Sequence, residues 1–292
     1  LHGLAVWYEG DLPPVQSVEA YRKAALQTTR VFARDGRLVA ELWRERRTLV
    51  AGEEIPRRIR EVAVAAEDGE FYRHDGVDPL GILRAIVVNL RDQRFSQGAS
   101  TITQQLARSF YLSADKTLER KLLEVFLARK LETHLDKDEI LTLYLNQIYF
   151  GHGRWGIAEG ARYYLGKSVA DLSVADAALL MALVPAPERL NPFSAYHAAI
   201  ERRDRIIGRM VVLGYASEGE AARHRQEIPI LSKPGSLQTS APWFVDVVKR
   251  RLIDALGRDE VMTGGLSVYT TVDLDAQAGV DAAMKTHLGD AP

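Results

Sequence analysis

The feature that most constrains the fold is the stretch from Pro56 to Val212, where the sequence pattern is helical almost throughout. Apolar residues recur there at the three- to four-residue spacing of amphipathic helices. Clusters of glycine, aspartate and serine interrupt the pattern near residues 69–78, 91–100, 113–116, 151–156 and 166–173. Such clusters end helices. The sequence therefore predicts a mainly α domain made of several short helices.

A short β-hairpin is predicted before this domain. Asp35 and Gly36 lie between two apolar runs within Arg30–Leu42, and Asp-Gly in that context is a strong turn signal. Pro13 and Pro14 exclude a continuous helix through the arm that precedes the hairpin. We assign residues 1–55 to an arm and hairpin.

The sequence after Gly214 differs from the helical stretch. It predicts a linker at Lys233–Ser236, a helix over Trp243–Leu256 and a β-strand over Leu266–Val272 whose partner the sequence does not show. We therefore assign residues 56–225 to the core domain and residues 226–292 to a linker and a first strand leading toward another domain.

Composition excludes several classes of function. The 38 lysines and arginines balance 39 aspartates and glutamates, so the net charge is −1 and no global basic surface exists for nucleic acid. The chain has no cysteine, which excludes disulfides and thiolate metal sites. No apolar run reaches the roughly 20 residues of a membrane-spanning helix. The start, Leu1–Tyr8, fits the end of a missing membrane anchor and an ordinary apolar terminus equally well.

Two adjacent carboxylates, Glu67 and Asp68, end an apolar helical run, and a His74-Asp75-Gly76 turn follows. A carboxylate at the edge of an apolar run can be partly desolvated, which raises its pKa toward that of a useful general base. A solvated helix end is the alternative for the carboxylates, and a structural role is the alternative for His74.

A helix is predicted to begin near Thr101, because Thr101 and Gln104 have the spacing of a capping box. Backbone N–H groups at such an N-terminus, with neighbouring hydroxyls and amides, can receive an anionic group. A well-capped helix with no further role is the alternative.

A narrow polar stripe runs along the predicted helix Lys116–Leu131. At 100° per residue, Thr117, Lys121, Glu124 and Ala128 share one face, with Arg120 at its edge. The stripe indicates either a lined pocket or a plain ion pair between Lys121 and Glu124, which would stabilise the helix by only ~0.2–0.5 kcal/mol.

Five ordered motifs emerge between about Thr29 and Met210. They consist of Glu67, Asp68, Phe71, His74 and Gly76; Gly98 and Ser100–Gln105; Arg120, Lys121 and Glu124; Lys137, Ile140, Leu141, Tyr144, Leu145 and Asn146; and Gly156–Lys167, with Gly160 where alanine is commoner. Together they resemble the glycosyltransferase domain of class A penicillin-binding proteins and the monofunctional peptidoglycan glycosyltransferases.

The resemblance implies a mainly α, lysozyme-like, two-lobed glycosyltransferase domain with a groove between its lobes. It implies inverting transfer of the growing glycan from undecaprenyl diphosphate to the GlcNAc 4-hydroxyl of lipid II, forming β-1,4 bonds. It also implies a place on the periplasmic face of the inner membrane, contact with the membrane surface and with other cell-wall synthesis proteins, and inhibition by moenomycin-type phosphoglycolipids. It implies no required cofactor and no protein metal site, although a divalent cation beside the diphosphate stays open.

The resemblance also assigns roles to residues. Glu67 would be the general base, Lys121 would offset charge on the departing diphosphate, and Glu124 would lie near the leaving group. The residues expected to bind substrate are Asp68, His74, Ser100, Thr101, Thr103, Gln104, Gln105, Arg120 and Asn146.

Part of the domain is expected to meet lipid, because a polyprenyl substrate does not leave the bilayer. Large apolar residues fill Leu80–Phe95 and Phe110–Leu112, and arginines lie among them. Such arginines can reach toward anionic headgroups. We expect an exposed apolar patch near residues 88–112 and a mobile loop at residues 91–98.

Four other functions agree less well with these sequence features. A muramidase-like hydrolase would also need a glutamate, but it would not need Arg120 and Lys121 for a diphosphate. A nucleotide-sugar glycosyltransferase would use Asp-x-Asp, which occurs at residues 136–138 and 273–275 in unconvincing contexts. A transpeptidase would need Ser-x-Asn and Lys-Thr-Gly beside the Ser-x-x-Lys at residues 113–116, and both are missing. A catalytically silent scaffold would not need Glu67.

Overall fold

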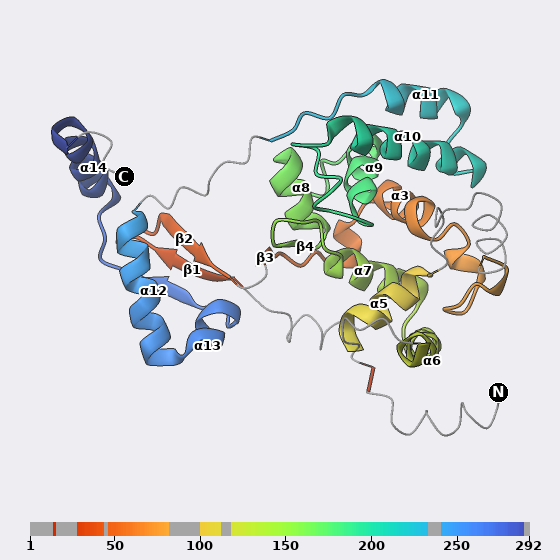
Figure 1. The fold of residues 1–292 in the computed structure, drawn as a ribbon, viewed down its shortest axis with the longest axis horizontal. Helices are drawn as coiled ribbons and strands as arrows, with labels where there is room; N and C mark the ends of the chain where they lie inside the picture. Colours follow the sequence, from red (N-terminus) through yellow and green to blue (C-terminus); the bar gives the residue numbers. More distant parts are fainter. Residues whose placement is uncertain are drawn as a thin grey trace. The chain divides into compact units, whose positions relative to one another are not determined.

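The structure, a computed structural model, describes residues 14–15, 28–43, 46–81, 100–111, 118–232 and 241–288. It divides into two compact units (Figure 1). The larger unit comprises residues 1–24 and 49–231, and the smaller unit comprises residues 25–48 and 232–292. The predicted hairpin and the C-terminal segment, which the sequence assigns to separate parts, therefore share one unit.

The larger unit is helical, which confirms the predicted mainly α class. Its α-helices are α3 (Arg57–Glu67), α5 (Ile102–Tyr111), α6 (Leu118–His134), α7 (Lys137–Gln147), α8 (Ile157–Leu165), α9 (Val174–Leu183), α10 (Tyr196–Val212) and α11 (Glu218–Gln226). The short elements η1 (Gly52–Glu54), η2 (Phe71–Arg73) and β4 (Arg154–Trp155) connect them.

Helix α9 forms the centre of the larger unit. All ten of its residues are buried, because the helix carries alanine, leucine, valine and methionine on every face and its one charged residue, Asp176, lies in the capping box begun by Ser173. Helices α3 and α10 pack against α9 and against each other (Figure 1). The end of α3, where Glu67 lies, is thereby fixed to the buried centre.

Helices α5, α6 and α7 form a second group in the same unit. Helix α5 packs against both α6 and α7, and α7 packs against α8. Helix α7 begins at the capping box of Asp136 and Glu139, and its residues Ile140–Asn146 are all buried. Gln105 in α5 contacts Glu67 at the end of α3.

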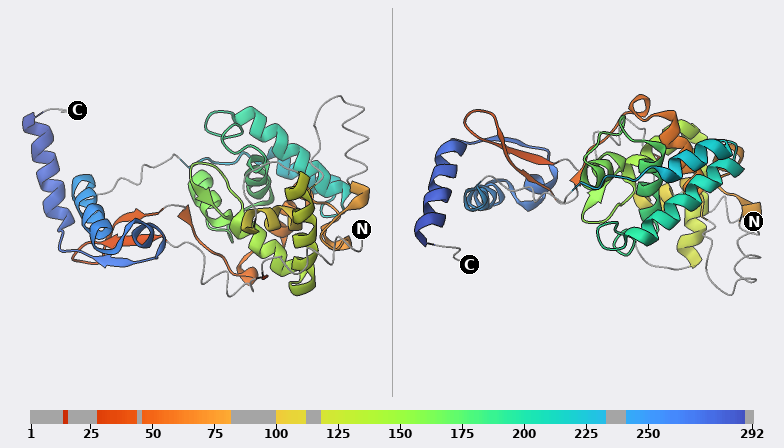
Figure 2. Two further views of the ribbon diagram at one scale, coloured as in Figure 1. Left: turned by 60° about the horizontal axis from the view of Figure 1, so that its bottom comes forward. Right: turned by 90° about the horizontal axis from the view of Figure 1, so that it is seen from above.

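The smaller unit is built on a three-stranded sheet with the order β2-β1-β5. Strands β1 (Thr29–Phe32) and β2 (Leu38–Leu42) are antiparallel, which confirms the predicted hairpin. Helices α12 (Pro242–Leu256) and α13 (Arg258–Thr263) pack against this sheet around a core that includes Val31, Val245 and Val261 (Figures 1 and 2). The unit also contains β3 (Arg46–Arg47) and ends with α14 (Leu274–Leu288).

The strand predicted over Leu266–Val272 is shorter than expected and does have a partner. Strand β5 (Ser267–Tyr269) pairs in parallel with β1, with Val268 opposite Val31. Parallel pairing joins segments that are far apart in the sequence, which is why local pattern did not reveal it.

Two expectations about the membrane have different outcomes. Among the described residues, no helix is both long enough and apolar enough to cross a bilayer. The apolar patch and mobile loop expected near residues 88–112 fall mostly outside the described residues, so they stay predictions.

The packing of α3 generates a stability prediction. Val62 in α3 is fully buried, whereas Val212 at the end of α10 is 85% exposed. Val62→Ala should lower the free energy of unfolding by about 2 kcal/mol, because it removes two buried methyl groups and leaves a cavity. Val212→Ala, the same chemical change, should stay within about 0.5 kcal/mol. Chemical denaturation of both variants measures the difference, and equal effects would contradict the burial of α3.

Candidate active site

Glu67 is the last residue of α3, and its carboxylate contacts α5. Its Oε2 accepts a hydrogen bond from Nε2 of Gln105 at 2.9 Å. The hydroxyl of Tyr144 in α7 in turn donates to Oε1 of Gln105 at 3.4 Å. Glu67 therefore lies where three helices meet, with one carboxylate oxygen bound to a neutral amide.

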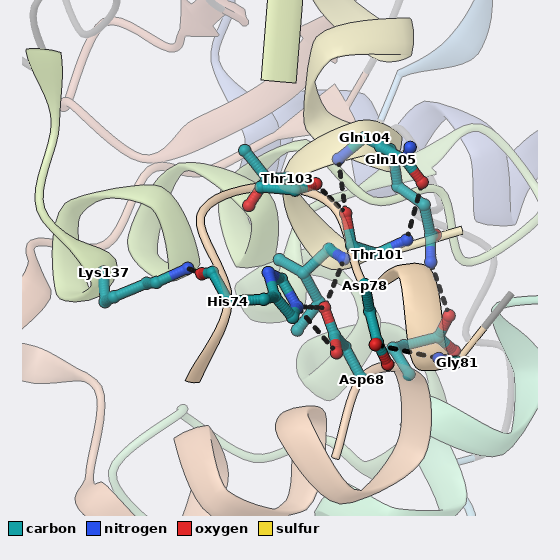
Figure 3. Close-up of polar contacts among 12 residues, drawn as sticks. Asp68, His74, Asp78, Gly81, Thr101, Thr103, Gln104, Gln105 and Lys137 are labelled. Carbon is teal, nitrogen blue, oxygen red and sulfur yellow. Dashed lines mark hydrogen bonds and ion pairs between the residues drawn. The ribbon is translucent and has the colours of Figure 1, made fainter. Parts of the chain in front are cut away.

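Asp68 joins the end of α3 to the start of α5. Its carboxylate accepts from the backbone N–H of Ile102 at 3.1 Å and contacts Nε2 of His74 at 3.0 Å (Figure 3). The first N–H groups of a helix have no intrahelical partner and carry partial positive charge. A carboxylate at that position satisfies one of them and stabilises the helix start.

The turn after Asp68 is fixed against the same helix start. The hydroxyl of Thr101 donates to the carbonyl oxygen of Gly76 at 2.7 Å. Gly76 has φ of +82°, and a Cβ there would lie 2.9 Å from the carbonyl oxygen of Ala128. Only glycine fits this position without strain, so the turn can lie directly on α6.

Burial raises the pKa of Glu67 above its ordinary value of 4.5. The hydrogen bond from Gln105 and the charges of Arg202 and Arg209 act in the opposite direction, whereas the charge of Asp68 adds to the rise. The net result is a raised pKa of Glu67. A carboxyl group with a raised pKa is a stronger base once ionised, which suits general-base chemistry.

A cluster of charged side chains is centred on Glu124, which is fully buried. The ammonium of Lys121 lies 2.7 Å from Oε2 of Glu124 and also donates to the hydroxyl of Ser100 at 2.9 Å. Nε of Arg120 lies 3.4 Å from Oε1 of Glu124. The predicted stripe thus forms a compensated cluster, and Lys121 stays 44% exposed at its surface.

Helix α5 connects the two groups. Ser100, just before α5, contacts Lys121, and Gln105 within α5 contacts Glu67. A cavity of about 200 Å³ begins beside Gln105. It is lined by Gln105, Arg108, Ser109, Tyr144, Gln147, Ile148, Tyr149, Trp155, Val184 and Pro187. Glu67 and the cavity therefore lie beside Gln105 of α5, and Lys121 lies beside Ser100, just before that helix.

Several residues expected to bind substrate are buried and bonded to the protein. Thr101 and Gln104 form the predicted capping box: the Thr101 N–H donates to Gln104 Oε1, and the Gln104 N–H donates to Thr101 Oγ1, each at 3.1 Å. The hydroxyl of Thr103 donates to Glu132 at 2.6 Å. The side-chain amide of Asn146 bonds to backbone groups of Val50 and Thr142. Their contact with substrate stays a prediction.

Sequence reasoning missed charged residues that surround the predicted site. Arg202 and Arg209 of α10 act on Glu67 through their charges. Together with Arg205 they follow the spacing i, i+3, i+7, so they share one helix face. Glu132 likewise continues the stripe of Glu124 and Ala128 by one turn. In both cases helical spacing was the available signal.

No cluster of three or more potential metal ligands among histidine, cysteine, aspartate and glutamate occurs within the described ranges.

Residues 35–211 match the model of the family described as transglycosylase. The chain belongs to this transglycosylase family. The match covers the helical core, including the α3–α5 contact and the Glu124 cluster. The mainly α fold and the resemblance to the glycosyltransferase domain of class A penicillin-binding proteins are thus confirmed.

Relatives of this transglycosylase chain carry the name penicillin-binding protein 1A. The protein of Vibrio cholerae is 38% identical over 99% of this chain and 35% of its own length. The protein of Escherichia coli K12 is 37% identical over 99% of this chain and 34% of its own length. The chain therefore spans about a third of the length of the curated relatives it matches.

A solved structure supports the transglycosylase fold. The crystal structure of penicillin-binding protein 1A from Haemophilus influenzae aligns with a TM-score of 0.54 at 22% sequence identity. The alignment covers 90% of this chain and 30% of the other. At that identity the likeness shows the fold, and the function rests on the site.

The position of Glu67 generates a prediction about catalysis and stability. Glu67→Gln should lower the rate of glycan transfer by about 10²–10⁴-fold, because the general base is lost. The same change should raise the thermal unfolding midpoint at pH 7. A carboxyl group with a raised folded-state pKa costs stability once ionised, and this cost disappears below its ordinary value of 4.5.

Two measurements check this prediction. Thermal melts at pH 4 and pH 7 should show that the gain in stability of Glu67→Gln is confined to the higher pH. Glu61→Gln is the matched control on the same helix, where Glu61 pairs with exposed Arg57, and it should leave the rate unchanged. Turnover of Glu67→Gln within threefold of the parent chain would assign the base elsewhere.

The Glu124 cluster generates a separate prediction. Lys121→Ala should reduce turnover far more than the ~0.2–0.5 kcal/mol of a helical ion pair explains, whereas Lys121→Arg should be milder because a cation remains. Lys130→Ala on the same helix is the control. If thermal stability falls in Lys121→Ala while steady-state turnover does not, Lys121 serves the fold alone.

Proposed function

We propose that this chain polymerises peptidoglycan glycan strands. The donor is the growing glycan on undecaprenyl diphosphate, the acceptor is the GlcNAc 4-hydroxyl of lipid II, and the product bond is β-1,4. The observation that carries the proposal is that the start of α5 and the residue just before it contact a desolvated glutamate and a lysine cluster. Gln105 contacts Glu67, and Ser100 contacts Lys121.

The proposed reaction divides the work between these two groups. Glu67 accepts the proton of the acceptor hydroxyl as that oxygen attacks the anomeric carbon of the donor. The bond to the diphosphate oxygen breaks on the opposite face of the sugar ring, so the configuration inverts. Lys121 and Arg120 stabilise the negative charge that develops on the departing diphosphate. Glu124 positions both cations.

Hydrolysis by a related fold is the main alternative. A hydrolase protonates a neutral sugar oxygen as its leaving group and gains little from a cation pair. The cations of Lys121 and Arg120, which contact the buried carboxylate of Glu124, are instead suited to an anionic leaving group. The site therefore favours transfer from a diphosphate.

The proposal assigns the diphosphate charge to side chains and not to a resident metal. The charge of the Glu124 carboxylate is already compensated by Lys121 and Arg120, which makes it a poor ligand for an additional metal cation. A loosely bound divalent cation carried by the diphosphate itself remains compatible with this arrangement.

The proposed location follows from the proposed substrate. A polyprenyl chain stays in the bilayer, so the domain would act at the periplasmic face of the inner membrane and contact its surface. Other cell-wall synthesis proteins would be its protein partners. The relatives that share the family are about three times as long as this chain, and any further activity they have is not carried over.

The test is incubation of the chain with lipid II in detergent. We expect a glycan polymer that lysozyme digests, and we expect a moenomycin-type phosphoglycolipid to block its formation by occupying the donor side. A fluorescent β-lactam should not label the chain, since Ser-x-Asn and Lys-Thr-Gly are missing from the sequence. Released disaccharide-peptide without polymer would support hydrolysis, and labelling at Ser113 would overturn the assignment.

A further inference from the structure

Glu132 lies outside the residues assigned above, at the end of α6, and it is largely buried. Its Oε1 accepts from the hydroxyl of Thr103 at 2.6 Å and from the ammonium of Lys137 at 2.7 Å. The Glu132 side chain is 8% exposed and that of Lys137 is 21% exposed. One carboxylate oxygen thus binds groups from α5 and α7 while it belongs to α6.

Lys137 extends this cluster to the turn that follows Asp68. Its ammonium also donates to the carbonyl oxygen of His74 at 2.6 Å (Figure 3) and lies 4.5 Å from the centre of the Phe71 ring. We call Thr103, Glu132, Lys137 and the His74 carbonyl the Glu132 cluster. It ties α5, α6, α7 and the 71–76 turn together.

We propose that Glu132 is a positioning residue for the catalytic base: through Thr103 it fixes α5 so that Gln105 faces Glu67. Thr103 and Gln105 are two residues apart on α5, so a rotation or slide of the helix moves both. Glu132 touches neither Glu67 nor Gln105 in any contact described above. This inference rests on the proposed function only in treating Glu67 as the base.

Position matters here because hydrogen bonds weaken steeply with distance and angle. The bond from Gln105 to Glu67 is 2.9 Å long, so a displacement of about 1 Å would break it. Loss of that bond removes stabilisation of the ionised carboxylate. Within the described part of the chain, the other charged or titratable groups that act on Glu67 are Asp68 from its own turn, Tyr144 from α7, and Arg202 and Arg209 from α10. None of these four belongs to the Glu132 cluster.

The direction in which the pKa of Glu67 changes after substitution of Glu132 distinguishes a positioning role from a direct electrostatic one. Removal of a negative charge at Glu132 would by itself favour the ionised form of Glu67 and lower its pKa. Loss of the hydrogen bond from Gln105 would instead raise the pKa of Glu67. A rise in the pKa of Glu67 after Glu132→Ala is therefore expected only if α5 has moved.

The experiment is titration of the Glu67 carboxyl by ¹³C NMR in the full chain without substrate, alongside kcat and KM for lipid II. We expect Thr103→Val and Glu132→Ala each to raise the Glu67 midpoint by about one pH unit. We expect kcat to fall by about tenfold or more with KM changed much less. Glu132→Gln keeps an acceptor oxygen and should recover most of both values.

Matched controls come from elsewhere in the larger unit. Thr142→Val removes a buried hydroxyl that donates to Asp138 within α7, and Glu159→Ala removes a buried glutamate paired with Arg162. Both should leave the Glu67 midpoint unchanged. In a Gln105→Ala background, Thr103→Val should add no further shift, because the bond that it disturbs is already gone.

An unchanged or lowered Glu67 midpoint in Thr103→Val and Glu132→Ala would overturn the inference, whatever their melting temperatures. If Glu132→Ala does not fold, Thr103→Val alone decides. Failure of the proposed function is a different result: the parent chain would form no polymer from lipid II, while the Glu67 midpoint would still respond to the two variants.

Discussion

The contact between the Asp68 carboxylate and the first turn of α5 is the one on which the site depends. Asp68 accepts from the N–H of Ile102 and contacts His74, so it compensates both the unpaired amide and the partial positive charge of the helix start. Because Asp68 directly follows Glu67, this contact fixes Glu67 relative to α5. Replacement of Asp68 would therefore disturb both helices at once.

Helix α5 then determines how the two halves of the chemistry are spaced. Ser100 lies just before α5 and contacts Lys121, and Gln105 lies in the first turn of α5 and contacts Glu67, so the start of this helix sets the distance between the two contacts. The capping box of Thr101 and Gln104 defines where this helix begins. Thr101 and Gln104, which the resemblance assigns to substrate binding, thus also define the helix start between Glu67 and Lys121.

Local signals predicted the elements but not their long-range partners. Asp35-Gly36 indicated the hairpin, Thr101 and Gln104 indicated the start of α5, and the Lys121–Glu124 stripe indicated a cluster, because each depends on residues close in sequence. The parallel pairing of β5 with β1 joins segments from opposite ends of the chain. The hydrogen bond from Thr103 to Glu132 joins α5 to α6, and a single helical pattern cannot reveal such a contact.

The environment of Glu67 suits the general-base role proposed for it. A direct ion pair with arginine lowers a carboxyl pKa by about 1–3 units and would weaken the base. Here the direct hydrogen bond comes from neutral Gln105, whereas Arg209 donates to the carbonyl oxygen of Ala66. Burial has the opposite effect on a cation: it lowers the pKa of Arg202, and the charges of neighbouring arginines lower it further. The arginine charges therefore limit the rise in the pKa of Glu67 that burial causes. Neither arginine is needed as a direct hydrogen-bond partner of the carboxylate, which can still accept a proton.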